Sequence, residues 1–460
     1  MKRFVWLWLA ASSLLLLARI VAAETRPQYG GKLRIAVRET PMSLDPGDNT
    51  QPDSLARRNL FSLIFETLVT VDDRGEVHPE LATRWQPETG NQRWRFEIRR
   101  GVRFHDGSEL TPEMAASALR TANASWKVFA EGDFVIVECD HADSDLPVQL
   151  ALTHNNIVKR NGGGEFSGKI SGTGPFHIED WQPGKRLTLV AEENHWRGRP
   201  FVDTIEIEMG INVHEQLLEL DSGKADVVQV APEQVQRVAM AGHRVSSSQP
   251  IELVALAFAN EAQTADDKLL RSALAHSIER GSMRSVLLQG TGEASAGLLP
   301  NWMSGYGFAF STNVDAKRAR PEREQLRAAP HLTLGYDAND PLARTLVERI
   351  ALNALDAGLT LRLTAEATAD VRLVRITLAS ADPWGSLGGL AVALGVMVPK
   401  TSEDSIEDLY SSEQALVAKQ RVIPLLHLPA EWALSPAVRD WRVGADGSWR
   451  LEEVWMDKEP

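Results

Sequence analysis

The chain has 460 residues, of which 62 are acidic and 49 are Lys or Arg, giving a formal net charge of −13 at pH 7. This length suggests about three domains, and the acidic balance argues against a nucleic-acid-binding protein, which needs a basic surface. Cys139 is the single cysteine, so no disulfide can form within the chain, and we interpret it as a small buried hydrophobe.

The first residues have the layout of a secretory signal peptide. Lys2 and Arg3 form a charged start, residues 4–18 form an apolar run, and residues 21–23 (VAA) are the small side chains of a cleavage site. The run is too short for a comfortable membrane span. We therefore expect residues 1–23 to be a cleaved signal peptide and the mature protein to be soluble in the periplasm. A lipid anchor is not expected, because the cleavage site has no cysteine.

A strand, a loop and a helix are predicted at the start of the mature chain. Residues 30–37 (GGKLRIAV) alternate apolar and polar side chains, as in a strand with one buried face. A proline-bounded loop follows at residues 41–46 (PMSLDP). Residues 55–71 carry apolar side chains at positions 60, 63, 64 and 68. This spacing predicts a helix that packs on a core.

A strand and a capped helix are predicted next. Apolar and charged side chains alternate along residues 94–99 (WRFEIR), which is typical of a half-buried strand. Asp106 followed by Gly107 favours a tight turn. Thr111 and Pro112 then have the residue types of an N-cap and a first helical position.

Several motifs could suggest catalysis or metal binding, but each has a simpler explanation. His105 and Asp106 are adjacent, and neighbouring residues at a strand end point to opposite sides. Residues 163–169 (GGEFSGK) match part of a phosphate-binding loop, yet Ile170 replaces the Ser or Thr, so we expect a glycine-rich loop. No paired-histidine zinc motif or nucleophile-elbow serine motif occurs. We therefore expect no enzyme activity, no catalytic residue, no cofactor and no metal site.

Four segments, in this order and spacing, resemble one protein family. They are GGKLRIAV, MSLDP, NLFSLIFETLVTVDDRGEVHPELATRWQ and WRFEIRRGVRFHDGSELTPE. In them the chain is similar to the peptide/nickel-type family (family 5) of extracytoplasmic solute-binding proteins of ABC importers. Later segments extend the resemblance over nearly all of the mature chain, among them GTGPF at residues 172–176. The resemblance thins at residues 120–170 and 364–421.

The resemblance implies an α/β fold with two lobes, of the type II-like periplasmic binding protein kind, and an extra domain inserted in lobe I. Carried onto this sequence, lobe I comprises residues 24–54, 170–256 and 435–460, the inserted domain residues 55–169, and lobe II residues 257–434. Strand and helix patterns alternate at residues 217–230 and 332–376, which agrees with an α/β class. The implied hinge crossings lie near residues 258–260 and 428–436.

Asp382 and Trp384 are the first candidate ligand-binding residues. The family has a lobe II aspartate in a Trp-x-x-Asp segment, which pairs with the α-amino group of a peptide, and residues 378–384 (LASADPW) are the nearest match here. The resemblance implies that role for Asp382, whose carboxylate can form a charge-assisted hydrogen bond with an ammonium group. The tryptophan expected before it is missing. A turn formed by Asp382 and Pro383 is the alternative.

Trp302 and Tyr306 are the second candidate pair. They lie in a segment rich in proline and glycine, residues 298–308 (LLPNWMSGYGF). Loops that a rigid scaffold holds at a cleft are common ligand sites. Packing inside lobe II is the alternative for Trp302.

The resemblance implies a periplasmic receptor that captures a small peptide or similar polar solute between two lobes, closes by hinge motion and delivers the solute to an inner-membrane ABC permease. We expect a monomer that binds no nucleic acid. A metal-chelate or haem receptor on the same fold is an alternative, for which His427 near a predicted hinge is the suggestive histidine. A degenerate sensor or chaperone-like protein is a further alternative, favoured by the thin resemblance at residues 364–421.

Overall fold

The computed structural model describes residues 26–48, 50–51, 53–88, 90–160, 170–326, 331–366, 368–398 and 405–457. The expected signal peptide and the glycine-rich segment at residues 163–169 lie outside these ranges. Within the described ranges, no helix combines the length and the apolar character that a membrane crossing requires.

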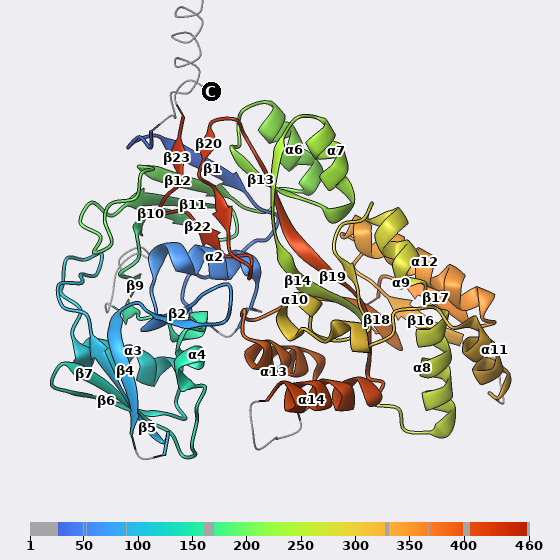
Figure 1. The fold of residues 1–460 in the computed structure, drawn as a ribbon. Coiled ribbons are helices and arrows are strands. Elements are labelled where there is room, and N and C mark those ends of the chain that lie inside the picture. The colour runs from blue at the N-terminus through green and yellow to red at the C-terminus, as the bar shows by residue number, and fades with distance from the viewer. Residues whose placement is uncertain are drawn as a thin grey trace, which may run out of the picture.

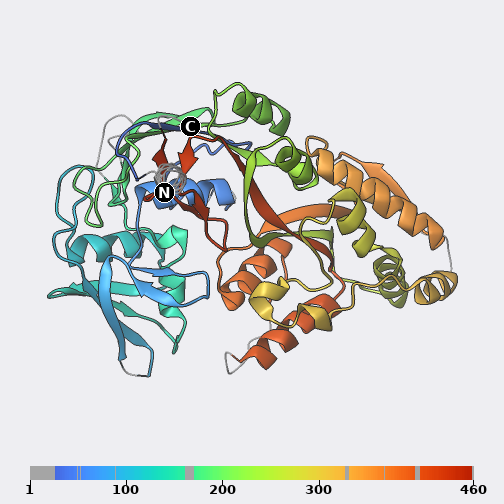
Figure 2. The ribbon, with the colours of Figure 1, turned by 45° about the horizontal axis from the view of Figure 1, so that its top comes forward.

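A long mixed β-sheet runs through both halves of the molecule and connects them (Figure 1). Its strands lie in the order β10-β11-β12-β1-β13-β19-β14-β18-β16-β17, and β15 pairs with β19. These strands are β1 (Lys32–Ala36), β10 (Phe176–Gln182), β11 (Arg186–Ala191), β12 (Thr204–Glu208), β13 (Val227–Val230), β14 (Arg244–Phe258), β15 (Glu293–Ala294), β16 (His331–Gly335), β17 (Thr360–Thr364), β18 (Val371–Thr377) and β19 (Val422–Leu434). Figure 2 shows the two halves on either side of the long strands β14 and β19.

Strands β14 and β19 are the connection between the two halves. They pair antiparallel, but the ladder is irregular between residues 247 and 252, where Pro250 lies opposite Pro429. A proline has no backbone N–H to donate to a ladder. Beyond this point Trp432 packs in the core of the first half, whereas Leu428 packs in a core of the second. The crossing between the lobes therefore lies at the two prolines.

The observed crossing agrees with one sequence expectation and corrects the other. On β19 it falls inside the expected residues 428–436. On β14 it precedes the expected residues 258–260, because Phe258 is the last residue of the strand and is buried in a core of lobe II. The 15-residue length of β14 explains the difference, since the strand has already paired with β18 of lobe II from Glu252 onward.

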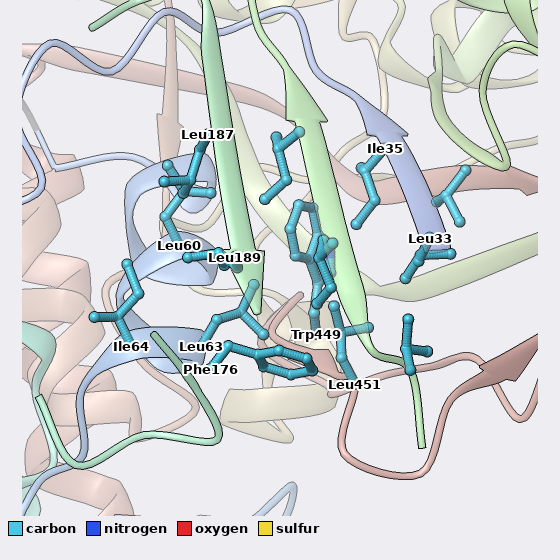
Figure 3. Close-up of a cluster of buried hydrophobic side chains, with 14 of the residues drawn as sticks. Leu33, Ile35, Leu60, Leu63, Ile64, Phe176, Leu187, Leu189, Trp449 and Leu451 are labelled. Carbon is cyan, nitrogen blue, oxygen red and sulfur yellow. The ribbon is translucent and has the colours of Figure 1, made fainter. Parts of the chain in front are cut away.

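The core of lobe I lies between α2 (Leu55–Ile64) and strands of the sheet. The Ser54 side chain caps this helix by accepting a hydrogen bond from the Arg57 amide. Figure 3 shows the buried side chains around it, and the labelled ones are Leu33, Ile35, Leu60, Leu63, Ile64, Phe176, Leu187, Leu189, Trp449 and Leu451. The side chains of α2 therefore lie in the core of lobe I, although we assigned residues from 55 onward to the inserted domain.

Helix α2 is also shorter than its apolar spacing predicts. We expected a helix over residues 55–71, whereas α2 ends at Ile64 and Val69–Val71 form strand β2, which pairs with β3 (Val77–Pro79). All residues of β2 are β-branched, which favours a strand. Leu68 continues the apolar spacing in sequence but is buried in the core of the inserted unit.

The inserted unit is built on a four-stranded antiparallel sheet. Its elements are β4 (Ala82–Glu88), β5 (Arg93–Ile98), β7 (Phe134–Glu138) and β6 (Lys127–Glu131), with α3 (Pro112–Ala122) and α4 (Leu146–Leu150). The predicted helix start is confirmed, since Thr111 accepts a hydrogen bond from the Met114 amide at 3.3 Å and Pro112 is the first helical residue. Cys139 packs against this core, and burial raises the pKa of its thiol to about 11.

His105 and Asp106 have separate partners, as the strand geometry predicts. His105 Nε2 forms a hydrogen bond with the Gly174 carbonyl oxygen at 2.9 Å. The Asp106 carboxylate lies 2.5 Å from Lys159 Nζ. The two side chains therefore tie the inserted unit to neighbouring segments and do not act on each other.

Lobe II has a core on each face of its sheet. Residues along β14 alternate between them. Leu253 and Ala255 contribute to the core that includes α13 (Pro383–Leu394) and α14 (Ile406–Ala418), and Val254 and Leu256 contribute to the core that includes α8 (Ala265–Ser277) and α12 (Pro341–Asp356). This alternation follows from the period of two in a strand. The other α-helices in the described ranges are α6 (Val213–Asp221), α7 (Val235–Met240), α9 (Arg280–Ser282), α10 (Asn301–Ser304) and α11 (Ala316–Glu324). Short two-stranded pairs are β8 (Lys159–Arg160) with β9 (Ile170–Ser171), β20 (Val438–Arg439) with β23 (Trp455–Met456), and β21 (Arg442–Val443) with β22 (Trp449–Arg450).

Candidate ligand-binding cleft

A cavity of about 400 Å³ lies between the two lobes, beside the crossing strands. Strand β1 pairs parallel with β12 and β13 in lobe I, and β16 pairs parallel with β17 and β18 in lobe II. The segments that line the cavity include residues 38–39 after β1, 231–234 after β13, 339–342 after β16, and 429–432 of β19. The carboxyl ends of parallel strands are where open α/β sheets bind ligands. The position of the cavity therefore fits a ligand site.

Arg375, at the end of β18, joins two carboxylates in the wall of the cavity. It lies 2.6 Å from Glu252 Oε2 and 2.6 Å from Asp340 Oδ2. Asp340 is also the N-cap of α12 and accepts a hydrogen bond from the Leu342 amide at 3.0 Å. Burial acts to lower the pKa of Arg375, but the two carboxylates outweigh it and raise the pKa above its usual value. Arg375 is therefore a charged structural part of the wall.

Glu431 is a buried acid at the crossing of the lobes. It is 5% exposed and accepts a hydrogen bond from the Ser247 hydroxyl on the neighbouring strand. Burial raises the pKa of Glu431 to about 7, against the opposing effect of the Ser247 hydrogen bond. In the part of the chain that the structure describes, this carboxylate forms no ion pair with a Lys, Arg or His side chain.

Two further acceptors on the lobe I side of the cavity lack donors. Glu233 Oε2 and Gln234 Oε1 are buried, and no donor among the described residues forms a hydrogen bond with either atom. Burial raises the pKa of Glu233, against the opposing effect of a hydrogen bond from its own backbone amide. By contrast, the Glu39 carboxylate accepts a hydrogen bond from Gln229 Nε2 at 2.9 Å. Buried acceptors without donors are rare in native proteins, and the residues that carry these two also line the cavity.

The four predicted ligand residues do not line this cavity. The Asp382 carboxylate caps α13 and accepts a hydrogen bond from the Gly385 amide at 2.5 Å, so Asp382 and Pro383 begin a helix where the alternative interpretation expected a turn. Trp384 and Tyr306 pack against the core of α13 and α14. Trp302 Nε1 donates to the Pro250 carbonyl oxygen at 2.8 Å, at the crossing. A direct ligand contact by these residues stays a prediction.

Tyr306 and His427 have partners inside lobe II. The Tyr306 hydroxyl donates to Glu413 Oε2 at 2.8 Å, and burial, together with that carboxylate, raises the pKa of the hydroxyl. His427 is fully buried and forms a hydrogen bond with the Leu298 carbonyl oxygen at 2.9 Å. The histidine that suggested a metal-chelate or haem receptor is therefore a core residue.

One group of potential metal ligands occurs among the described residues. The ligand atoms of Asp72, Glu76 and His78 lie within 4.8 Å of one another, in the hairpin of β2 and β3. Asp72 already accepts hydrogen bonds from the backbone amides of Arg74 and Glu76. These contacts are those of a tight turn, and the group lies outside the inter-lobe cavity.

The cavity residues are absent from the sequence-based prediction, but two sequence features indicate them. Arg38 follows the predicted strand GGKLRIAV, and Asn339 and Asp340 follow HLTLG and a short turn. Polar residues that follow the strands of βα units are natural ligand contacts. Glu431 is the charged residue inside the run VIPLLHLPAEWAL, and an acid in a run that is otherwise apolar indicates either a buried charge or a site.

Arg58 bridges the lobes beside a second cavity, of about 190 Å³, on the side of the inserted unit. From α2 its Nη1 donates to the carbonyl oxygens of Leu378 at 2.5 Å and Ala379 at 3.1 Å, just after β18. Its Nε lies 3.2 Å from Asp53 Oδ2. The segment that resembles the family's ligand loop is therefore held to lobe I by backbone contacts.

A buried pair of carboxyl groups, Glu66 and Glu80, also lies in the wall of the second cavity. Each is 7% exposed. Glu80 is 2.9 Å from Arg197, and Glu66 accepts a hydrogen bond from Trp196 Nε1 at 3.0 Å. Burial, and then the charge of Glu66, raise the pKa of Glu80 above its usual range, against the opposing effect of Arg197.

The pair predicts a pH dependence of stability. The pKa of Glu80 is higher in the folded protein than in the unfolded chain, so the folded state binds this proton more tightly and stability falls as pH rises from the unfolded pKa through the folded pKa. Glu80→Gln is expected to reduce this loss, because an amide needs no proton at that site. Melting temperatures from about pH 5 to about pH 9 test it. Glu76→Gln, at an exposed acid, is the control. The prediction is contradicted if the melting temperature falls with pH equally steeply in Glu80→Gln and in Glu76→Gln.

The sequence comparisons identify a family. The profile described as bacterial extracellular solute-binding proteins, family 5 Middle, matches residues 76–373. The probable D,D-dipeptide-binding periplasmic protein DdpA of Escherichia coli (strain K12) is 22% identical over 328 residues, which cover 65% of this chain and 64% of that protein. The uncharacterized protein YhjP of Bacillus subtilis (strain 168) is 32% identical over 209 residues, 42% of this chain and 35% of that protein. The chain thus spans less than two thirds of the length of these curated relatives.

Solved structures share the fold over almost their whole length. DppA from Helicobacter pylori, in complex with the peptide STSA, has a TM-score of 0.77 at 16% identity and covers 94% of this chain and 99% of its own. NikA from Staphylococcus aureus, in complex with Ni(L-His)2, has a TM-score of 0.74 at 15% identity, with coverage of 93% and 100%. At such identities the likeness concerns the fold alone, whereas the family profile matches most of the chain. This chain therefore belongs to family 5 of the bacterial extracellular solute-binding proteins and has their two-lobed α/β fold.

Proposed function

We propose that this protein is the periplasmic solute-binding component of an ABC importer, which captures a small peptide or similar polar solute and delivers it to an inner-membrane permease. The observation that carries this proposal is the cavity of about 400 Å³ at the crossing of the lobes. A solute there contacts both lobes at once, so it stabilises the arrangement in which they are close.

Relatives named as a probable dipeptide-binding periplasmic protein and as an oligopeptide-binding protein support the proposed ligand class, and the first name also supports the compartment. Export through the predicted signal peptide, action as a monomer and docking to a permease are parts of the same proposal. So is the division into lobe I, an inserted domain and lobe II, with α2 assigned to lobe I because its side chains lie in that core.

Ligand screening tests the proposal. The mature chain is screened by thermal shift against pools of short peptides, metal chelates and opine-like compounds, and any binder is followed by small-angle X-ray scattering. We expect at least one pool to raise the melting temperature and to lower the radius of gyration, since a receptor closes on its solute. If no pool raises the melting temperature, the receptor proposal is wrong.

Removing the Arg58 bridge is expected to favour the open arrangement. A hydrogen bond from a charged donor contributes about 1.5 to 3 kcal/mol to stability. The Arg58 guanidinium donates such bonds to carbonyl groups of the other lobe. Scattering of ligand-free Arg58→Ala should give a larger radius of gyration than the unmodified protein. Arg84→Ala, at an exposed arginine of β4, is the control. Equal radii in all three proteins would show that Arg58 does not hold the lobes together.

A further inference from the structure

The inter-lobe cavity has more acidic than basic side chains in its wall. The carboxylates are Glu39, Glu233, Glu252, Asp340 and Glu431, and the basic groups with a permanent charge are Arg38 and Arg375. Arg375 is already paired with both Glu252 and Asp340. Arg38 is therefore the remaining permanent cation for the other carboxylates of the wall.

Glu431 has the least compensated charge of these acids. Glu431 is only 5% exposed. Its carboxylate accepts a hydrogen bond from the Ser247 hydroxyl, which carries no charge. A buried carboxylate without a countercharge is costly and tends either to take up a proton or to acquire a cation. Glu431 lies on β19 at the crossing of the lobes, so residues of both lobes can contact a group that is bound to it.

The charged and titratable groups that face the cavity come from every element around it. They are Arg38 and Glu39 after β1, His214 of α6, Glu233 after β13, Glu252 of β14, Asp340 at the start of α12, and Arg375 of β18. Among these described residues none forms an ion pair with Glu431. Directly opposite Glu431 on the neighbouring strands stand Val230 and Ser247, which carry no charge.

We propose that the solute of this receptor carries a cationic nitrogen, an ammonium or guanidinium group, and that Glu431 at the crossing of the lobes is its counter-ion. This inference rests on the proposed receptor function. A cationic nitrogen supplies the positive charge that Glu431 lacks in the cavity wall, and its N–H groups can donate hydrogen bonds to the Glu431 carboxylate. A neutral or anionic solute leaves the Glu431 charge uncompensated.

The same geometry links binding to a proton. Burial raises the pKa of the Glu431 carboxyl to about 7. At neutral pH, a fraction of the unbound receptor molecules therefore carries a proton on Glu431. The cation binds the ionised form, and the proton leaves to solvent. Affinity therefore rises with pH and falls about tenfold for each pH unit below that pKa.

The charge class of the solute is tested with matched compounds. Calorimetry of the mature chain compares cadaverine with N,N′-diacetylcadaverine and with glutarate, and the dipeptide Ala-Ala with N-acetyl-Ala-Ala, which lacks the ammonium group. We expect the member of each set that carries an ammonium group to bind at least about tenfold tighter than its neutral or anionic partners. Equal or tighter binding of neutral or anionic members overturns the cation proposal and leaves the receptor function intact. No binding by any member, together with no response to the ligand pools above, overturns both.

The role of Glu431 is tested by an isosteric change. Glu431→Gln keeps the shape and the acceptor for Ser247, and is expected to weaken the cationic probe about tenfold or more and to remove the pH dependence of its affinity. Glu179→Gln, at an exposed acid of β10, changes the net charge equally and serves as the control. His214→Gln should keep the pH dependence, which would exclude the histidine as its source. Unchanged affinity and pH profile in Glu431→Gln would overturn the proposal.

A second variant keeps the test open should Glu431→Gln fold poorly. Ser247→Ala removes the hydroxyl that donates to the Glu431 carboxylate. Because that hydrogen bond favours the ionised acid, its loss is expected to move the midpoint of the affinity profile to higher pH. A midpoint that stays in place would count against Glu431 as the group that titrates.

Discussion

Replacing Arg375 by methionine is expected to lower the free energy of unfolding by about 3 to 5 kcal/mol. The guanidinium joins Glu252 of β14 to Asp340, the N-cap of α12. The side chains of Arg375, Glu252 and Asp340 are largely buried, with exposures of 20%, 21% and 9%. Removing one partner of such a group leaves the others as buried, uncompensated charges. Urea unfolding followed by tryptophan fluorescence measures the loss.

Two comparisons make the Arg375 prediction specific. Arg344→Met removes an exposed arginine that pairs with Glu348 one helical turn away, and it is expected to change stability little, since exposed pairs contribute little. Adding Glu252→Gln to Arg375→Met should restore part of the lost stability, because one orphaned charge is then removed. Equal losses in Arg375→Met and Arg344→Met would show that the buried ion pairs do not stabilise the fold.

Replacing Gly172 by alanine is expected to destabilise the protein by about 3 kcal/mol or more. A Cβ at this position would lie 1.9 Å from the Ile64 carbonyl oxygen and 2.7 Å from Phe65 Cδ1. The contact is with backbone at the end of α2, which cannot swing aside as a flexible side chain can. Either α2 moves off the sheet of lobe I or the backbone at residue 172 shifts, and both disturb the core in Figure 3.

A second glycine provides the control for Gly172. Gly388 lies inside α13, and a Cβ there would meet no atom within 4 Å. Gly388→Ala is therefore expected to gain about 0.5 to 1 kcal/mol, the usual advantage of alanine in a helix. Midpoints of urea unfolding compare the two variants. A Gly172→Ala midpoint at or above that of the unmodified protein would contradict the close approach of α2.

Local patterns in the sequence determined much of the framework. The alternation along residues 94–99 predicts β5, and Thr111 with Pro112 predicts the start of α3, because pleat and cap depend on residues that are neighbours in the chain. The order of such segments also indicated the family and hence the two-lobed α/β fold. The separation of His105 from Asp106 followed from strand geometry alone.

Tertiary structure decided the end of α2, the place of the crossing and the residues of the cavity. The apolar spacing at Leu68 continues a helix in sequence, but the residue is buried in another core. Asp382 and Tyr306 carry groups suited to a ligand, yet Asp382 caps the helix that it begins and Tyr306 bonds to Glu413, more than 100 residues away in sequence.

The acidic cavity is the clearest example of a feature that the sequence alone does not predict. Arg38, Asp340 and Glu431 come from three distant parts of the chain, and they line one space because β14 and β19 cross between lobes whose parallel strands end there. Composition reveals that acids are in excess, but whether a given acid is paired depends on which strand ends meet. Sequence alone thus determined the family and the scaffold. The packing of the two lobes against each other decided where the solute is expected to bind and which charge is left for it.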